Sequence, residues 1–171
     1  MEKIKNNKFF ILIFICTIFI IILPNLNSNL LIGDDYIFHL ARIQSMADSI
    51  RNGLFPVKIN STLANNFGYG VSFFYPDLFL YFPSLIMVIF NVSLIFSYKI
   101  FIVAYLCFMF LIFYKSFYYL TNNKSTSIFG TIFLLLSKVL FLSLYNRFAL
   151  GEFLGFAFIL PAIVRNVWLY I

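Results

Sequence analysis

The sequence predicts an all-α integral membrane protein, and three observations lead to that fold class. Of the 171 residues, 63% are hydrophobic and only 11% are charged, with a mean hydropathy of +0.97. A chain of this size keeps a large surface, so it cannot hide that much apolar area in a globular core. Apolar runs of membrane length also recur along the chain. We therefore expect the lipid bilayer to be the main partner of this surface.

The positive net charge has a membrane explanation as well. The net charge of +6 could indicate nucleic-acid binding, but the twelve Lys and Arg residues stand singly beside apolar runs and form no basic stripe. Cations placed in this way are typical of topology signals on the cytoplasmic side of a membrane. Cys16 and Cys107 both lie inside apolar runs, where free thiols pack as small hydrophobic groups. We expect no nucleic-acid partner.

The first apolar run covers residues 9–23 and follows three lysines, Lys3, Lys5 and Lys8. A basic head before an apolar body is also the pattern of a cleaved secretory signal peptide. Residues 24–29 offer no small-x-small cleavage site, and the rest of the chain is itself apolar. We expect an uncleaved helix in the plasma membrane, with its N-terminus in the cytoplasm.

The segment 24–77 is then an external loop, and residues 35–51 within it have helical periodicity. Apolar residues recur at spacings of three and four, namely Tyr36, Leu40, Ile43, Ala47, Ile50 and Leu54. The opposite face carries Asp35, His39, Arg42 and Ser49, and Asn52-Gly53 is a strong helix stop. We expect an amphipathic helix in the interface plane, with its polar face toward an aqueous cleft.

Four further apolar segments follow, at residues 78–96, 100–120, 128–145 and 153–171. If every segment crosses, Arg147 and Glu152 lie in the cytoplasm. If residues 78–96, interrupted by Pro83 and Asn91, do not cross, both lie outside with the first loop. The chain stops inside an apolar run, so we expect it to be the N-terminal part of a longer protein.

Several stretches resemble a known family. They are Asp35-Tyr-Ile-Phe-His39-Leu-Ala-Arg42, Asn52-Gly53-Leu-Phe55-Pro56, Gly68-Tyr69-Gly70 with Phe74-Tyr75-Pro76, and Tyr145-Asn-Arg147-Phe-Ala-Leu-Gly151-Glu152 followed by Pro161. In order, they resemble the polytopic family labelled 6-pyruvoyl-tetrahydropterin synthase-related membrane proteins. That family is similar in layout to the GT-C-type glycosyltransferases that act in the cell envelope, including those of bacteria. Val71-Ser72 and Asp77 depart from the family pattern.

The resemblance implies a GT-C-like N-terminal helical bundle and an activity. Such enzymes transfer a sugar from a polyprenyl-phosphate donor to an extracytoplasmic acceptor. Asp35, or its neighbour Asp34, would be the catalytic base or a metal-side carboxylate in the first external loop. Glu152 would be the second acidic residue, and Arg147 would meet the lipid phosphate. The resemblance also favours the topology that puts these loops on one side.

The reaction itself requires a base for the acceptor proton and a cation for the departing phosphate. Arg147 and Lys138 are candidate phosphate contacts, and His39 and Arg42 are candidate substrate-binding residues beside Asp35. A divalent cation held by Asp35 and Glu152 is another way to hold the phosphate. The single histidine and the absence of a glycine-rich phosphate loop remove most other catalytic motifs.

Each candidate also has a structural interpretation. As structural groups, Asp34 and Asp35 would cap a helix, and His39 and Arg42 would pair with Asp35 on a solvated face. Lys138 is placed like a snorkelling lysine, and Arg147 with Glu152 like an interface ion pair. A non-catalytic membrane subunit or a transporter component is therefore the alternative to a transferase.

Overall fold

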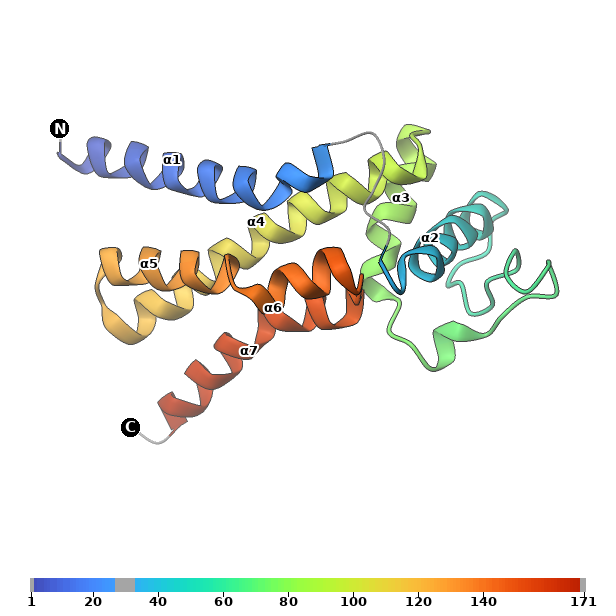
Figure 1. Ribbon diagram of the computed structural model, residues 1–171. Coiled ribbons are helices and arrows are strands. Elements are labelled where there is room, and N and C mark those ends of the chain that lie inside the picture. Colours follow the sequence, from blue (N-terminus) through green and yellow to red (C-terminus); the bar gives the residue numbers. More distant parts are fainter. Residues whose placement is uncertain (1, 27–32, 170–171) are drawn as a thin grey trace. The chain divides into compact units, whose positions relative to one another are not determined.

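The computed structural model describes residues 2–26 and 33–169, and the side chains of residues 8–26 and 33–165. Within this part of the chain all regular elements are helical, which confirms the all-α part of the predicted fold class (Figure 1). The one β-type pairing there is an isolated antiparallel bridge between Asn60 and Tyr69. The chain divides into two compact units, residues 1–31 with 103–171 and residues 32–102.

The first unit is a bundle of apolar helices. It contains α1 (Glu2–Ile22), most of α4 (Leu94–Thr121), α5 (Lys124–Leu135), α6 (Lys138–Phe141), the π-helical turn η4 (Leu142–Asn146) and α7 (Leu150–Leu169). Aromatic rings join α1 to α4, with centroids 4.8 Å apart for Phe10 and Tyr114 and 4.9 Å apart for Phe14 and Phe110. The earlier residue of α1 meets the later residue of α4, so the two helices run antiparallel.

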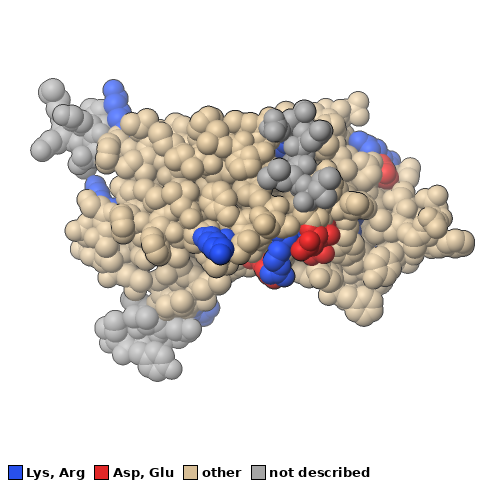
Figure 2. Space-filling view, in the orientation of Figure 1, with Lys and Arg blue, Asp and Glu red and all other residues tan. Residues whose placement is uncertain are grey.

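Three helical segments in the described part are long and apolar enough to cross a membrane: Lys8–Leu26, Leu94–Thr121 and Lys124–Asn146. A bilayer crossing needs about 20 apolar residues. Large apolar side chains such as Ile15, Phe129 and Phe133 are exposed on these segments. Figure 2 shows that uncharged residues cover most of the visible face. The length and composition of these helices confirm the prediction of a membrane protein.

The α4–α5 connection is a tight helical hairpin. Asn122 adopts a left-handed conformation (φ 48°), and the Asn123 side chain accepts a hydrogen bond from Thr126 N at 3.2 Å. A Cβ at Gly130 would lie 2.9 Å from the Phe117 ring, so the absence of a side chain permits this close approach. The predicted connector of residues 121–127 is therefore shorter in the structure, where only two residues separate the helices.

The predicted apolar segment 128–145 is not one continuous helix. After α5 ends at Leu135, Ser137 begins a new helix, and its hydroxyl accepts a hydrogen bond from Leu140 N at 3.4 Å. A π-helical turn follows, in which Arg147 N donates to Leu142 O at 2.9 Å. Such turns insert an extra residue into a helix and often lie at functional sites.

The second unit is built on α2 (Tyr36–Arg51) and α3 (Tyr81–Phe90). The buried Ser84 hydroxyl joins them, because it lies 3.0 Å from Ile43 O on α2 and 2.8 Å from Leu80 O. The core between them contains Ile43, Met46, Ala47 and Met87, all at most 3% exposed.

The helix α3 has only ten residues, because the left-handed Asn91 (φ 49°) ends it. At 1.5 Å per residue this covers about 15 Å, half the hydrocarbon thickness of a bilayer. The preceding 3-10 turn Leu78–Leu80 adds little length. The apolar helical stretch Leu78–Phe90 is shorter than a bilayer crossing needs, and whether residues 78–96 cross the membrane stays a prediction.

The predicted helix 35–51 is found as α2, but its predicted setting is wrong. The polar residues His39, Arg42 and Ser49 are at most 3% exposed and do not line an open aqueous cleft. The following loop covers them, since Thr62 N donates to Ser45 Oγ at 3.4 Å and Arg42 donates to Pro76 O at 3.3 Å. The polar residues that were predicted to face a cleft are therefore buried, whereas Ile37 and Arg51 of α2 are exposed.

Candidate functional site

Two exposed carboxylates, Asp34 and Asp35, stand at the start of α2. Asp35 occupies the N-cap position, yet its side chain makes no capping hydrogen bond, and only its backbone O accepts one from His39 N at 3.1 Å. A capping carboxylate would accept a bond from the second or third backbone N–H of the helix. The purely capping interpretation of Asp35 is therefore wrong, and its oxygens remain accessible to a substrate.

His39 lies one turn after Asp35 and is 3% exposed. Burial, together with the positive charge of Arg42, lowers its pKa to about 4, although Asp35 opposes the shift. The imidazole is therefore neutral near pH 7. Its Nδ1 is buried without a hydrogen-bond partner, and the ring lies beside Phe38 with centroids 5.2 Å apart.

Arg42 is the most deeply buried charged residue of α2, at 1% exposure. Its guanidinium carbon lies 5.4 Å from the ring centroids of both Phe38 and Tyr75, and Nη2 donates to Pro76 O. Burial lowers its pKa, while the negative charge of Asp77 opposes the shift. These contacts hold residues 75–77 against α2. They favour a structural role for Arg42 over the predicted substrate contact, and they contradict pairing on a solvated face.

The second predicted group lies at the turn before α7. Arg147 Nη1 and Glu152 Oε2 form an ion pair of 2.7 Å, with side chains 56% and 51% exposed. The π-helical turn η4 ends directly before Arg147, and a left-handed Phe148 (φ 56°) lies between Arg147 and Glu152. The predicted ion pair between Arg147 and Glu152 is confirmed, whereas its location at a membrane interface stays a prediction. Both groups also remain open to an incoming ligand.

Sequence reasoning missed Ser143, which belongs to this group. Its hydroxyl donates to Glu152 Oε2 at 3.2 Å and is buried in η4. A cavity of about 400 Å³ opens beside these two residues, and its other walls are apolar: Val139, Leu140, Phe153, Gly155, Phe156 and Ile159. No pattern in the sequence singles out one serine in an apolar run, because only the π-helical turn brings it to Glu152.

Lys138 does not join the Arg147–Glu152 group. It is the exposed first residue of α6 and lines a separate cavity with Phe129, Phe133 and Ser137. The prediction that Lys138 and Arg147 contact one phosphate finds no support in this arrangement.

The predicted site residues thus fall into both compact units. Asp34, Asp35, His39 and Arg42 belong to residues 32–102, whereas Lys138, Arg147 and Glu152 belong to the other unit. A cavity shared by Asp35 and Glu152 stays a prediction.

A metal site also stays a prediction. Among the described residues, no group of three or more His, Cys, Asp or Glu side chains could hold an ion. Divalent cations such as Mg²⁺ and Ca²⁺ take six or more oxygen ligands, so Asp35 and Glu152 would form only part of a site.

Comparisons of the chain with protein-family models, with curated proteins and with solved structures found no match. Any functional assignment therefore depends on the geometry of these residues and on the membrane topology.

Proposed function

We propose that this chain is part of a GT-C-type membrane glycosyltransferase, which transfers a sugar from a polyprenyl-phosphate donor to an acceptor outside the cytoplasm. The observation that carries the proposal is the order of the candidate spans. One span, Lys8–Leu26, precedes the loop with Asp35, and three spans precede the Arg147–Glu152 turn. If each of these candidate spans crosses the bilayer once, an odd number of crossings comes before each loop, and both loops then emerge on the same side of the membrane.

The cations support an outward direction for that side. Lys8, Lys115 and Lys124 lie near the start of α1 and around the hairpin between α4 and α5. The Phe10–Tyr114 contact ties the start of α1 to the end of α4. Lys and Arg concentrate on the cytoplasmic side of membrane proteins. The opposite ends of these helices, where the carboxylates follow, then face outward.

The proposed chemistry divides between the two groups. Asp35 accepts the proton of the acceptor hydroxyl as that oxygen attacks the anomeric carbon of the sugar. The bond from this carbon to the phosphate oxygen breaks, and the phosphate leaves with the electron pair. Arg147 holds the departing phosphate through charge-assisted hydrogen bonds, and Glu152 orients the guanidinium from 2.7 Å.

The cavity beside Glu152 suits the lipid part of the donor. Its apolar walls include Val139, Leu140 and Phe156, whereas Ser143 and Glu152 supply polar atoms. Polyprenyl chains are apolar and carry one phosphate end, so a mostly apolar cavity with a polar group fits that chemistry.

The decisive experiment replaces Asp35 by Asn in the full-length protein and measures sugar transfer in reconstituted membranes. Loss of a general base is expected to reduce the rate by about 10²- to 10⁴-fold. Asp48→Asn is the matched control, because Asp48 lies on the same helix and binds Arg51 at 3.0 Å and Gln44 at 3.0 Å. Asp35 is not the base if Asp35→Asn retains transfer at the rate of the control.

A non-catalytic membrane subunit is the second candidate. It is favoured by the burial of His39 and Arg42, because two of the predicted substrate contacts then have structural roles. This alternative predicts no transfer by the wild-type chain at any donor concentration, together with stable association with a catalytic partner. Quantitative pull-down beside the transfer assay separates the two.

A further inference from the structure

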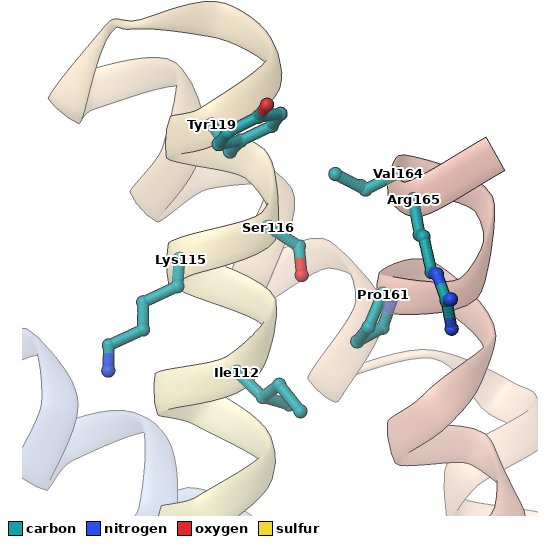
Figure 3. Close-up of a pocket in the computed structure, with 7 residues that line it drawn as sticks. All are labelled: Ile112, Lys115, Ser116, Tyr119, Pro161, Val164 and Arg165. Atoms are coloured by element: carbon teal, nitrogen blue, oxygen red, sulfur yellow. The ribbon is translucent and has the colours of Figure 1, made fainter. Parts of the chain in front are cut away.

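A third cavity in the first unit lies away from the Arg147–Glu152 group. It has a volume of about 360 Å³ and is lined by α4 and α7 through Ile112, Lys115, Ser116, Tyr119, Pro161, Val164 and Arg165 (Figure 3). Most of the lining is apolar, and none of the lining residues is acidic. This cavity has no part in the transfer chemistry proposed above.

The polar groups of the cavity are hydrogen-bond donors. Figure 3 shows Ser116 on α4 facing Pro161 on α7, with the Arg165 side chain lying alongside Pro161. Among the described residues, Arg165 forms no ion pair and no hydrogen bond. The Ser116 side chain in the cavity wall is buried, with 8% of the residue exposed. Lys115 starts at the cavity wall, but its side chain extends to the other side of α4 (Figure 3). Arg165 is therefore the cation that serves this cavity.

The position of the cavity along the helix axis matches that of a lipid headgroup. Ser116 is five residues before the end of α4 at Thr121, which is roughly 8 Å along the helix axis. The same end of the unit carries Lys8 and Lys124, since Phe10 on α1 contacts Tyr114 on α4. No described acidic side chain lies within two turns of the cavity lining on either helix. Positive charge near a membrane surface attracts anionic lipids.

We propose that the cavity between α4 and α7 binds an anionic phospholipid of the surrounding leaflet. The guanidinium of Arg165 contacts the headgroup phosphate, and the hydroxyls of Ser116 and Tyr119 donate to phosphate or ester oxygens. One acyl chain lies against Ile112 and Val164. An unpaired arginine inside a membrane is costly, and the phosphate supplies the missing counter-charge.

Pro161 lines the cavity from α7. It lies inside this helix and has no N–H, so the carbonyl four residues earlier loses its helical partner. Its ring faces Ser116 in Figure 3 and forms part of the apolar wall.

The test uses the full-length protein in detergent, mixed with equal amounts of phosphatidylglycerol and phosphatidylcholine that carry the same acyl chains. Native mass spectrometry counts each lipid retained per protein. We expect wild-type protein to prefer phosphatidylglycerol and Arg165→Gln to reduce that preference about fivefold, the effect of one basic residue at a membrane surface. Lys124→Gln is the matched control and is expected to keep the preference within about twofold, because Lys124 lies at the same end of the unit but does not line the cavity.

Three outcomes would overturn the proposal. The first is an equal preference for phosphatidylglycerol in Arg165→Gln and wild type, and the second is no such preference in the wild type. The third is full displacement of phosphatidylglycerol by millimolar inorganic phosphate, which indicates a free-anion site. Helix content from circular dichroism checks that the variant folds. If Arg165→Gln does not fold, Ser116→Leu decides, because it fills the cavity and should lower phosphatidylglycerol retention while Arg165 remains.

Discussion

Two arginines of this chain, Arg42 and Arg147, have opposite surroundings. Arg42 is 1% exposed between two aromatic rings and a backbone carbonyl, and its Nε has no hydrogen-bond partner. Arg147 is half exposed and forms a 2.7 Å ion pair with Glu152. The buried cation organises the fold around it, whereas the exposed cation adds little stability and can exchange its carboxylate for a ligand phosphate. Burial thus separates a structural arginine from a candidate functional one.

The largest expected effect tests this contrast directly. Arg42→Ala should destabilise the protein by about 3 kcal/mol, because it removes the Pro76 hydrogen bond and leaves a cavity between Phe38 and Tyr75. Arg147→Ala should cost less than about 1 kcal/mol, since an exposed ion pair contributes little. Thermal unfolding in detergent, followed by circular dichroism, measures both. Equal losses in the two variants would show that burial does not distinguish these arginines.

The pH dependence of stability sharpens the same comparison. The pKa of His39 is lowered to about 4 in the folded protein, so the unfolded state binds more protons between about pH 6.5 and pH 4. Stability is therefore complete above pH 6.5 and falls as the pH drops toward 4. From pH 7 to pH 5, where carboxylates stay mostly ionised, the expected loss is about 2 kcal/mol.

The control for this effect is His39→Gln, which removes the titrating group. Its unfolding temperature should change much less than that of the wild type over the same pH interval. If the unfolding temperatures of wild type and variant change equally with pH, the pH dependence belongs to other groups.

The smallest expected effect compares two helix N-caps. Asn123→Ala should cost about 1 kcal/mol, because its side chain accepts a hydrogen bond from Thr126 N. Asp35→Ala should change stability by only a few tenths of a kcal/mol, because its side chain makes no capping bond. Chemical unfolding of each variant measures the difference. A larger loss of stability for Asp35→Ala than for Asn123→Ala would show that Asp35 has a structural role.

Sequence reasoning located α2 well, and local physics explains why. The helical spacing of its apolar residues, the two aspartates before it and the Asn52-Gly53 stop all depend on neighbours in sequence, and the helix runs from Tyr36 to Arg51. What covers its polar face depends on distant residues. Pro76 and Tyr75 reach Arg42 from more than thirty positions away, and no periodicity encodes that contact.

The apolar segments show the same limit. Composition identified the spans, but it did not reveal the helix break at Ser137 or the π-helical turn after it. The residues at both interruptions are mostly apolar, so the hydropathy of the sequence does not change there. The contact of Ser143 with Glu152 follows from that turn, so it was found only once the backbone path was known. The Arg147–Glu152 pair was predictable because the two oppositely charged side chains lie five positions apart at the end of an apolar run.

The two-residue link between α4 and α5 bears on how the chain enters the membrane during synthesis. With Phe117 packed against Gly130, the two helices form a hairpin whose tip carries Lys124. Pulling that tip through the hydrocarbon would expose a charge to a cost of about 3 kcal/mol, so the hairpin is far easier to insert with its tip left behind. We therefore expect the hairpin tip with Lys124 to stay on the side from which the chain inserts.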